Sequence, residues 1–388
     1  MFRRFDREET KTVSTPTEPA ERRSNLELYR IVAMLFIIAH HYVVHSGLRG
    51  LESIWLDPMS FHSQFILLFG AWGKIGINCF VLITGYFMCT RSISLRKFLK
   101  LFCEIMFYMI LAVILIEVTG YRHLSLSEVF SYLFPIRELN TDFYCGFLVF
   151  YLFIPFLNIL VRHMGEKAHV RFLALLSFAY IFLGTVPGFS VTMNNSVWFI
   201  VLYFISSYIR LYPKEMFRNR RFWGIASLAC IFACALSVVL CTLFGVKTGA
   251  GIAHSWHFVM DSNRLPAVLT ALSTFMYFNN LKIPQSRLIN TIASTTFGVL
   301  LIHANGAETA RWLWIDLLHT VESHATSFGY LHALLCVPLV FAAASCIDLL
   351  RIRFIERPFF KVLDRKLPGI TAGWKRLEER FFKKCHIS

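Results

Sequence analysis

Five titratable side chains interrupt the apolar segment 25–47, which is long enough to cross a bilayer as one helix. They are Glu27, Arg30, His40, His41 and His45. Such groups are costly inside a membrane, and they usually mark a functional site. Arg30 and His41 are eleven residues apart, about three helical turns, so we expect them on one helix face and about 16 Å apart along the axis. Glu27 and His45 join that face through i,i+3 and i,i+4 spacing.

The residue types indicate what this helix face can do. Histidine is the usual general base, and His41 is placed to act as one or to carry a group transiently as a nucleophile. Arg30, nearer the membrane surface, suits an anionic ligand. Structural interpretations compete with these roles, because Arg30 can pair with Glu27 at the interface and His41 can be a hydrogen-bonded core histidine. His40 points away from this face, and we expect it to be a helix-packing donor.

The composition identifies the class of protein. Of the 388 residues, 56% are hydrophobic and only 16% are charged, whereas a soluble domain has about 25% charged residues. The net charge of +15 could indicate nucleic acid as a partner, but Lys and Arg lie almost wholly in alternate connecting segments, which is typical of membrane topology. The ten cysteines show no Cys-X-X-Cys pair and no ligand spacing with histidine, so we expect neither a disulfide framework nor a metal site.

Ten apolar segments are long enough to span a membrane. They lie near residues 26–48, 64–90, 96–118, 141–161, 170–187, 196–212, 222–245, 264–279, 288–304 and 330–352. The polar, basic residues 1–24 are expected to form a disordered cytoplasmic arm without a cleavable signal peptide. Residues 25–355 would form the transmembrane domain, and residues 356–388 a basic, amphipathic cytoplasmic tail. The sequence therefore predicts an all-α polytopic membrane protein.

The cations set the orientation of these spans. If the N-terminus is cytoplasmic, only seven of the 39 Lys and Arg residues fall outside the inner segments. These seven are Arg49, Lys74, Arg122, Arg137, Lys247, Arg264 and Arg311. Omitting one span would reverse all later segments and destroy the bias. We therefore predict about ten spans, both termini in the cytoplasm, and a multi-pass place in the cytoplasmic (inner) membrane.

Several motifs occur in a fixed order along the chain. Arg30 and His41 are separated by ten residues, Thr84-Gly85-Tyr86 closes the second apolar segment, and a basic cluster opens the third. That cluster is Arg96, Lys97 and Lys100. Two further motifs follow later in the chain: residues 297–303, which end in Leu-Ile-His303, and Glu356-Arg-Pro358. In this order they resemble the motifs of the bacterial membrane acyltransferase type 3 family, across about residues 25–360. Residues 150–158 and 194–203 are similar to the branch that modifies surface polysaccharides.

The resemblance implies an integral membrane O-acyltransferase. Its donor would be acetyl-coenzyme A or a related acyl-coenzyme A, and its acceptor a hydroxyl of a cell-surface glycan or glycolipid precursor. His41 and Arg30 would be the catalytic residues, because a hydroxyl is a poor nucleophile without a base. The substrate-binding candidates are Glu27, His45, Arg96, Lys97, Lys100 and His303. Lys97 and Lys100 depart from the arginines that relatives often carry, and a lysine cannot bind phosphate with a bidentate fork.

Other functions and roles stay open. A transporter or flippase could use the same stripe, the helix face that carries Glu27, Arg30, His41 and His45, as a proton or substrate relay. The chain shows no convincing inverted repeat, however. A membrane sensor has no feature in its favour beyond the histidines. Glu104 and Asp348 are either functional intramembrane acids or partners of the basic cluster, and Lys74 either meets an acceptor phosphate or snorkels to the interface. The loops 49–63 and 305–329 are either solvated connectors or substrate contacts.

Overall fold

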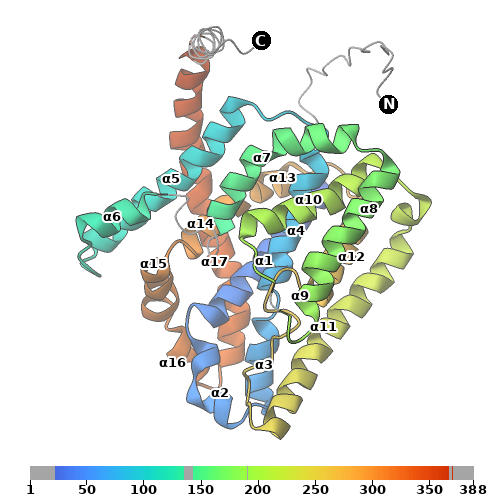
Figure 1. Ribbon diagram of the computed structural model, residues 1–388. Coiled ribbons are helices and arrows are strands. Elements are labelled where there is room, and N and C mark those ends of the chain that lie inside the picture. The colour runs from blue at the N-terminus through green and yellow to red at the C-terminus, as the bar shows by residue number, and fades with distance from the viewer. Residues whose placement is uncertain (1–21, 135–142, 190, 367–368, 370–388) are drawn as a thin grey trace, which may run out of the picture.

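The computed structural model describes residues 22–134, 143–189, 191–366 and 369 (Figure 1). Helices make up its regular structure, and no strand occurs in these residues. The predicted all-α class is therefore confirmed for the part of the chain that is described.

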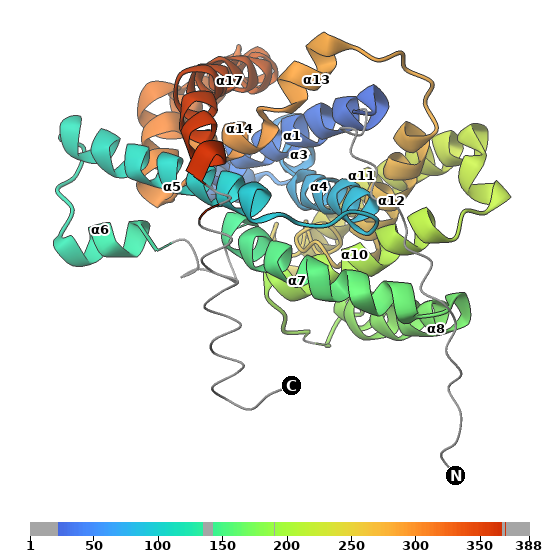
Figure 2. The same ribbon diagram turned by 90° about the horizontal axis from the view of Figure 1, so that it is seen from above.

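The helix α1 (Ser24–Val44) occupies the centre of the molecule. It contacts α4 (Gly73–Met88), α12 (Leu265–Asn279), α14 (Thr296–His303) and α17 (Gly329–Arg351). Figure 2 shows α1 and α4 in the middle, with α7, α8 and α10 on one side and α13 and α17 on the other. Twelve of the 21 residues of α1 are buried, so the helix with the titratable stripe is also the core of the fold.

The remaining helices surround this centre. They are α2 (Glu52–Leu56), α3 (Phe61–Phe69), α5 (Leu95–Val118), α6 (Leu126–Tyr132), α7 (Phe143–His163), α8 (Glu166–Leu176), α9 (Leu183–Thr185), α10 (Asn195–Leu211), α11 (Arg220–Thr248), α13 (Arg287–Ala293), α15 (Ala307–Arg311) and α16 (Thr320–His324). Short 3-10 turns occur at Leu48–Gly50 and Glu215–Arg218, and π-helical turns at Ser177–Phe182, Trp312–Leu317 and Ile352–Glu356.

Two glycines let α4 approach α1 closely. A methyl group in place of the hydrogen of Gly73 would overlap the ring of His40, and one at Gly76 would overlap Ile37 and the carbonyl of Ala33. Because glycine has no Cβ, the two backbones can come together at these positions. This contact fixes the first turn of α4 against the histidine-bearing half of α1.

The lengths of the helices test the predicted spans. Seven helical segments in the described residues are long and apolar enough to cross a membrane: Ser24–Gly50, Phe61–Met88, Leu95–Val118, Phe143–His163, Glu166–Thr185, Arg220–Thr248 and Gly329–Lys366. Arg287–His303 and Ala307–Leu317 pass only as a pair bent by 97°, which makes them a broken span or a re-entrant loop. α10 and α12 are shorter, with 17 and 15 residues. Ten crossings and two cytoplasmic termini stay predictions.

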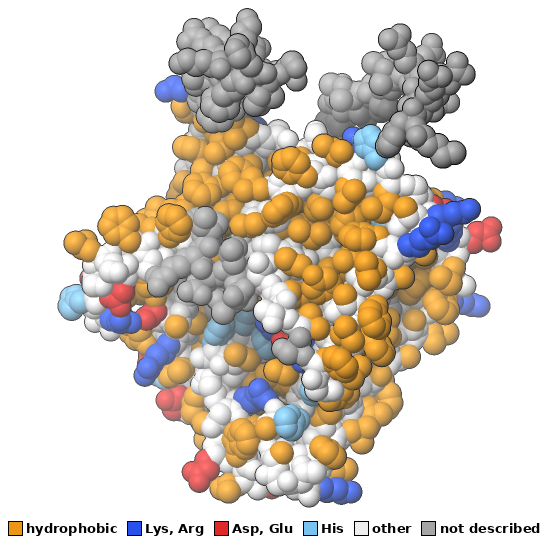
Figure 3. All heavy atoms as spheres, in the orientation of Figure 1, with side chains coloured by type: hydrophobic (Ala, Val, Ile, Leu, Met, Phe, Trp, Pro, Cys, Tyr) orange, Lys and Arg blue, Asp and Glu red, His pale blue; other side chains and the backbone are white. Residues whose placement is uncertain are grey.

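The surface agrees with a membrane location. Hydrophobic side chains cover much of the face shown in Figure 3, most densely in its upper and right-hand parts. On α11, for example, Ile225, Leu228 and Phe232 are each about two-thirds exposed or more. Such large apolar patches are rare on soluble monomers and are expected where a protein meets lipid. The chain is therefore a multi-pass membrane protein.

The two predicted terminal segments lie mostly outside the described residues. Of the predicted arm 1–24, only the last three residues are described, and they are bound to the body: Arg22 donates to the Asn290 carbonyl at 2.7 Å and Arg23 to Asn279 Oδ1 at 3.0 Å. The predicted tail 356–388 begins inside a continuous helical segment that runs to Lys366. Residues 370–388, which carry the predicted amphipathic character, lie outside the description.

Candidate active site

His41 and His303 are in direct contact although 262 residues separate them in the chain. His41 lies in the last turn of α1, and its Nδ1 is 2.9 Å from His303 Nε2. His303 ends α14, where the chain bends by 97° toward the next helix. Gly306, with φ of 85°, allows the turn after this bend, and Trp314 Nε1 donates to the His303 carbonyl at 3.3 Å. The bend thus presents a fully buried His303 to α1.

The hydrogen bonds fix which nitrogens carry protons. His303 Nδ1 is 2.5 Å from the carbonyl oxygen of Val299, and a carbonyl can only accept, so this nitrogen is the donor. In a neutral His303, Nε2 is then the acceptor, and His41 Nδ1 must donate to it. The remaining nitrogen of a neutral His41, Nε2, therefore carries the lone pair, and it makes no hydrogen bond with any residue that the structure describes. This is the tautomer that a general base needs.

A cavity of about 130 Å³, the His41 cavity, lies beside this pair. Its walls come from α1, α4, α7 and the end of α14: Ile37, His40, His41, His45, Gly73, Lys74, Ile77, Phe143, Tyr144, Leu300 and Ala304. The ring of His45 is 4.5 Å from that of His41, centre to centre. The structure thus brings together three of the candidate site residues, His41, His45 and His303.

His40 has the contact that the packing interpretation requires. Its Nδ1 is 2.6 Å from the carbonyl oxygen of Gly70, to which it donates, and Gly73 packs against its ring. Both contacts tie α1 to the segment that leads into α4. The ring of His40 is therefore held by structural contacts, in contrast to the free Nε2 of its neighbour His41.

A second cavity, of about 300 Å³, lies at the other end of α1 and is called the Arg30 cavity. It is lined by Arg22, Arg23, Glu27, Arg30, Thr84, Phe87, Met88, Arg91, Phe147 and Tyr151. Arg30 pairs with Glu27 at 3.4 Å, and its side chain keeps 27% of its exposure. Four arginines face one acid here, so the cavity carries a surplus of positive charge. α7 lines both cavities, with Phe147 and Tyr151 here and with Phe143 and Tyr144 at the His41 cavity.

The other three predicted donor-binding cations lie elsewhere. Arg96 forms two hydrogen bonds with Asp364, at 2.6 and 3.1 Å. Lys100 pairs with Glu356 at 2.7 Å, and Lys97 donates to the Ser92 carbonyl at 3.2 Å. None of the three lines the Arg30 cavity. The contacts of Arg96 and Lys100 connect the start of α5 to the helical extension of α17, whereas that of Lys97 is local.

Glu104 and Asp348 belong to the same structural region. Arg351 binds Glu104 at 2.9 Å, Asp348 at 2.7 Å and Glu356 at 3.0 Å, and its side chain is 5% exposed. Tyr108 also donates to Asp348 at 2.6 Å. The two intramembrane acids therefore have structural partners in this Arg351 network, which joins α5 to α17.

Sequence reasoning missed three arginines of the Arg30 cavity. Arg22 and Arg23 were assigned to the arm, and Arg91 to a connecting segment. Their only sequence signal is their place next to the ends of the first two apolar segments. The described residues contain no group of three His, Cys, Asp or Glu side chains that could hold a metal ion.

Comparisons with known proteins identify the family. No curated protein and no solved structure matches the chain. A family model described as an acyltransferase domain matches residues 23–347, which include the His41–His303 pair and every residue that lines the two cavities except Arg22. The chain therefore belongs to the type 3 acyltransferase family of membrane proteins.

Proposed function

We propose that this membrane acyltransferase moves an acyl group, preferentially acetyl, from cytoplasmic acyl-coenzyme A to a hydroxyl of a cell-surface glycan or its lipid-linked precursor. The observation that carries the proposal is the tautomer of His41: its Nδ1 is bound to His303, which leaves the Nε2 lone pair free beside a cavity. A base in this state suits the activation of a hydroxyl. The family supports acyl transfer as the reaction.

The reaction can be written with these residues alone. His41 Nε2 takes the proton of the acceptor hydroxyl while the hydroxyl oxygen attacks the thioester carbonyl. The new C–O bond forms, the C–S bond breaks, and the departing thiolate of coenzyme A receives the proton. If His41 accepts the acyl group first, its Nε2 attacks the thioester carbonyl, the C–N bond forms, and the C–S bond breaks to release the thiolate of coenzyme A. In the second step the hydroxyl oxygen attacks the acyl carbon, the C–N bond breaks to regenerate His41, and the hydroxyl proton passes to the thiolate.

The Arg30 cavity is the proposed site of the donor's phosphates. Guanidinium groups bind phosphate with two parallel hydrogen bonds, and four arginines surround this cavity. Arg30 and Ile37, which line the two cavities, are seven residues apart on α1, about 10 Å along the axis. The flexible arm of the donor would follow this helix face from the Arg30 cavity to His41.

We further propose that the protein crosses the cytoplasmic (inner) membrane ten times with the Arg30 cavity on the cytoplasmic side. The cation distribution supports this orientation. Single cysteines placed in a cysteine-free background report the side of each segment. A membrane-impermeant thiol reagent added from outside should label residue 52 and leave residue 214 unlabelled; labelling at 214 would reject the topology.

The test of the function compares two adjacent histidines. Membranes that contain the wild type, His41→Ala or His40→Ala receive radiolabelled acetyl-coenzyme A, and label in glycan is normalised to the amount of protein. Loss of a general base typically costs about 10²–10⁴-fold in rate, so His41→Ala should abolish labelling. His40→Ala removes a backbone hydrogen bond and should leave substantial turnover.

His45→Ala should lie between these two variants, since His45 lines the cavity without bonding to His303. Equal losses at His40 and His41, or losses that follow the amount of protein, would make the histidines structural. The absence of any covalent product with the wild type would reject acyl transfer to a glycan. That result would return the stripe to the transport hypothesis.

A further inference from the structure

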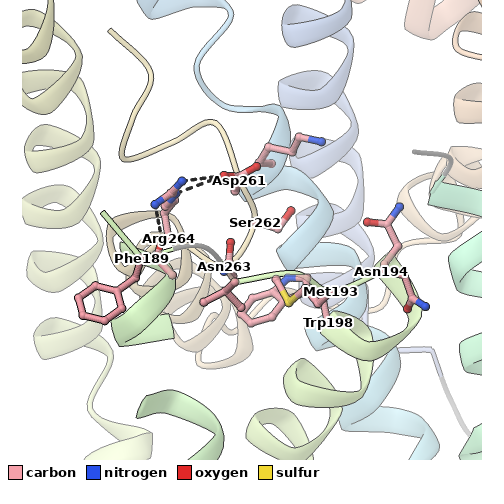
Figure 4. A pocket seen from close by; sticks show the side chains of 12 residues that line it. Phe189, Met193, Asn194, Trp198, Asp261, Ser262, Asn263 and Arg264 are labelled. Atoms are coloured by element: carbon pink, nitrogen blue, oxygen red, sulfur yellow. Dashed lines mark hydrogen bonds and ion pairs between the residues drawn. The ribbon is translucent and has the colours of Figure 1, made fainter. Parts of the chain in front are cut away.

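A third cavity, of about 360 Å³, adjoins the His41 cavity on the side of α10 and α12 and is called the Lys74 cavity. Lys74 lines both cavities, so a ligand in one would lie beside the reacting groups of the other. Figure 4 shows Arg264 and Phe189 toward one end of the Lys74 cavity, Asn194 and Met193 toward the other, and Ser262 and Asn263 between them. The lining is predominantly polar, which is unusual for a space within an apolar bundle.

Hydrogen bonds tie several walls of the Lys74 cavity together. Trp198 Nε1 donates to Asn78 Oδ1 at 2.8 Å, and Asn78 Nδ2 donates to the Ser262 carbonyl at 2.7 Å. Asn263 Nδ2 donates to the Tyr180 carbonyl at 2.8 Å. These buried hydrogen bonds fix the segment that leads into α12 against α4 and α10. A preformed cavity of this kind binds a ligand at a low cost in ordering.

The charges in the cavity favour an anion. Arg264 is bound to Asp261 at 3.0 Å and to the Gly184 carbonyl, so these two charges compensate each other. Lys74 makes no hydrogen bond and no ion pair with any described residue, and Asp261 attracts it only at longer range, so the cavity has two cations and one acid. The N-terminal ends of α4, α10 and α12 also meet at the cavity, and helix N-termini attract negative charge.

We propose that the Lys74 cavity is the subsite for the acceptor and that it selects an anionic saccharide, a sugar that carries a carboxylate or a phosphate. Lys74 would bind the anionic group, while the side chains of Asn194 and Asn263 offer hydrogen-bonding partners for hydroxyls. A hydroxyl of the bound sugar would then face His41. The inference rests on the proposed function, and it names the class of acceptor.

The test measures binding of small sugars to the full-length protein in nanodiscs of zwitterionic lipid, by saturation-transfer NMR without any acyl donor. The probes are glucuronic acid, glucose 1-phosphate and neutral glucose. A charged hydrogen bond from Lys74 should make the wild type bind at least one acidic probe about tenfold more tightly than glucose. The acidic probe that binds more tightly identifies the anionic group as carboxylate or phosphate.

Variants that should change the preference for acidic probes in opposite directions distinguish the loss of charge selection from misfolding. Lys74→Met should remove the preference for acidic probes, and Lys74→Arg should retain it. Asp261→Asn, which removes the acid and frees Arg264, should strengthen that preference. Lys247→Met is the matched control, because it removes an exposed cation in the last turn of α11, outside the cavity lining, and should change nothing.

Equal binding of acidic and neutral probes by the wild type, or an unchanged preference in Lys74→Met, would overturn the subsite. If Lys74→Met does not fold, Asp261→Asn decides, and a weaker or unchanged acidic preference there rejects the proposal. Loss of acyl transfer in Lys74→Met with intact sugar selection would place Lys74 in the reaction and also overturn it. The acetyl-labelling assay tests the proposed function separately. If the wild type selects acidic sugars but transfers no label, the proposed function is rejected and the Lys74 subsite is not.

Discussion

Two basic regions lie near the donor side of the proposed path, and they differ in what surrounds their cations. In the Arg30 cavity, four arginines and one acid, Glu27, line an open space of about 300 Å³, and Glu27 pairs with Arg30. Around the start of α5, Arg96 is paired with Asp364, and Lys100 with Glu356, which also binds Arg351. The first region has charge to offer a ligand, whereas the second uses its charge to join helices.

The difference shows that a cluster of cations in a sequence is not yet an anion site. What matters is whether carboxylates from distant segments reach the same cations. The partners of Arg96 and Lys100 lie more than 250 residues further along the chain. The following substitutions test the contrast between the two regions, in order of decreasing expected effect.

The largest effect is expected from Arg351→Met in the Arg351 network. The substitution leaves Glu104, Asp348 and Glu356 buried without their shared cation, which costs about 3–5 kcal/mol when one partner of a buried pair is removed. Protein level in the membrane and thermal unfolding should both fall. Arg353→Met, at an exposed neighbour, is the control and should leave both unchanged. A stable Arg351→Met protein that has lost only donor binding would make this region a ligand site.

Arg30→Ala should have the next largest effect, and it should act on the donor. Loss of a hydrogen bond to a charged group costs about 1.5–3 kcal/mol, tenfold or more in apparent donor affinity. Arg30→Lys should restore only part of it, since a fork differs from a point charge. The measurement is the dependence of acyl transfer on donor concentration, at constant acceptor. An unchanged donor dependence in both variants would contradict the assignment.

Arg91→Ala should weaken donor affinity by about 1 kcal/mol, because Arg91 lines the Arg30 cavity without an ion pair among the described residues. This variant tests a residue that the sequence motifs do not include. The same donor titration measures it, with Arg162→Ala as an exposed control near the end of α7, outside the cavity lining. If Arg91→Ala matches the wild type, the cavity extends less far toward the connecting segment than its lining indicates.

The smallest effect is expected from Arg96→Ala and Lys97→Ala. Both side chains lie away from the Arg30 cavity, and pairs at an exposed surface contribute little. Apparent donor affinity should therefore not change measurably. A loss as large as that of Arg30→Ala would remove the contrast between the two regions and restore the donor role that the family resemblance implies for this cluster.

The sequence was informative where local periodicity decides the structure. The spacing of Arg30 and His41 places both on one face of α1 because an unbroken apolar helix has a known pitch. The apolar segments correspond to helices for a similar reason. The number of crossings does not follow from periodicity in the same way, because α10 and α12 are short and the run that ends in His303 is bent.

Contacts between distant segments could not be predicted from the sequence. His303 entered the candidate site through a resemblance, and nothing in its spacing indicates that it meets His41 across 262 residues. The pairing of Lys100 with Glu356 also cannot be read from the sequence, which instead predicts that Lys100 binds the acyl donor. A segment that looks like a uniform apolar run gives no sign of a 97° bend, although Gly306 lies just beyond it.

The hydrogen-bond chain from His41 through His303 ends at the carbonyl oxygen of Val299, and this end has a consequence for charge movement. An amide carbonyl does not take up a proton at neutral pH, so protons cannot pass beyond Val299 along this hydrogen-bond chain. A proton that reaches His41 Nε2 must leave through the cavity by which it came. The catalytic cycle is then electroneutral across the bilayer along this route, and turnover should be insensitive to the membrane potential.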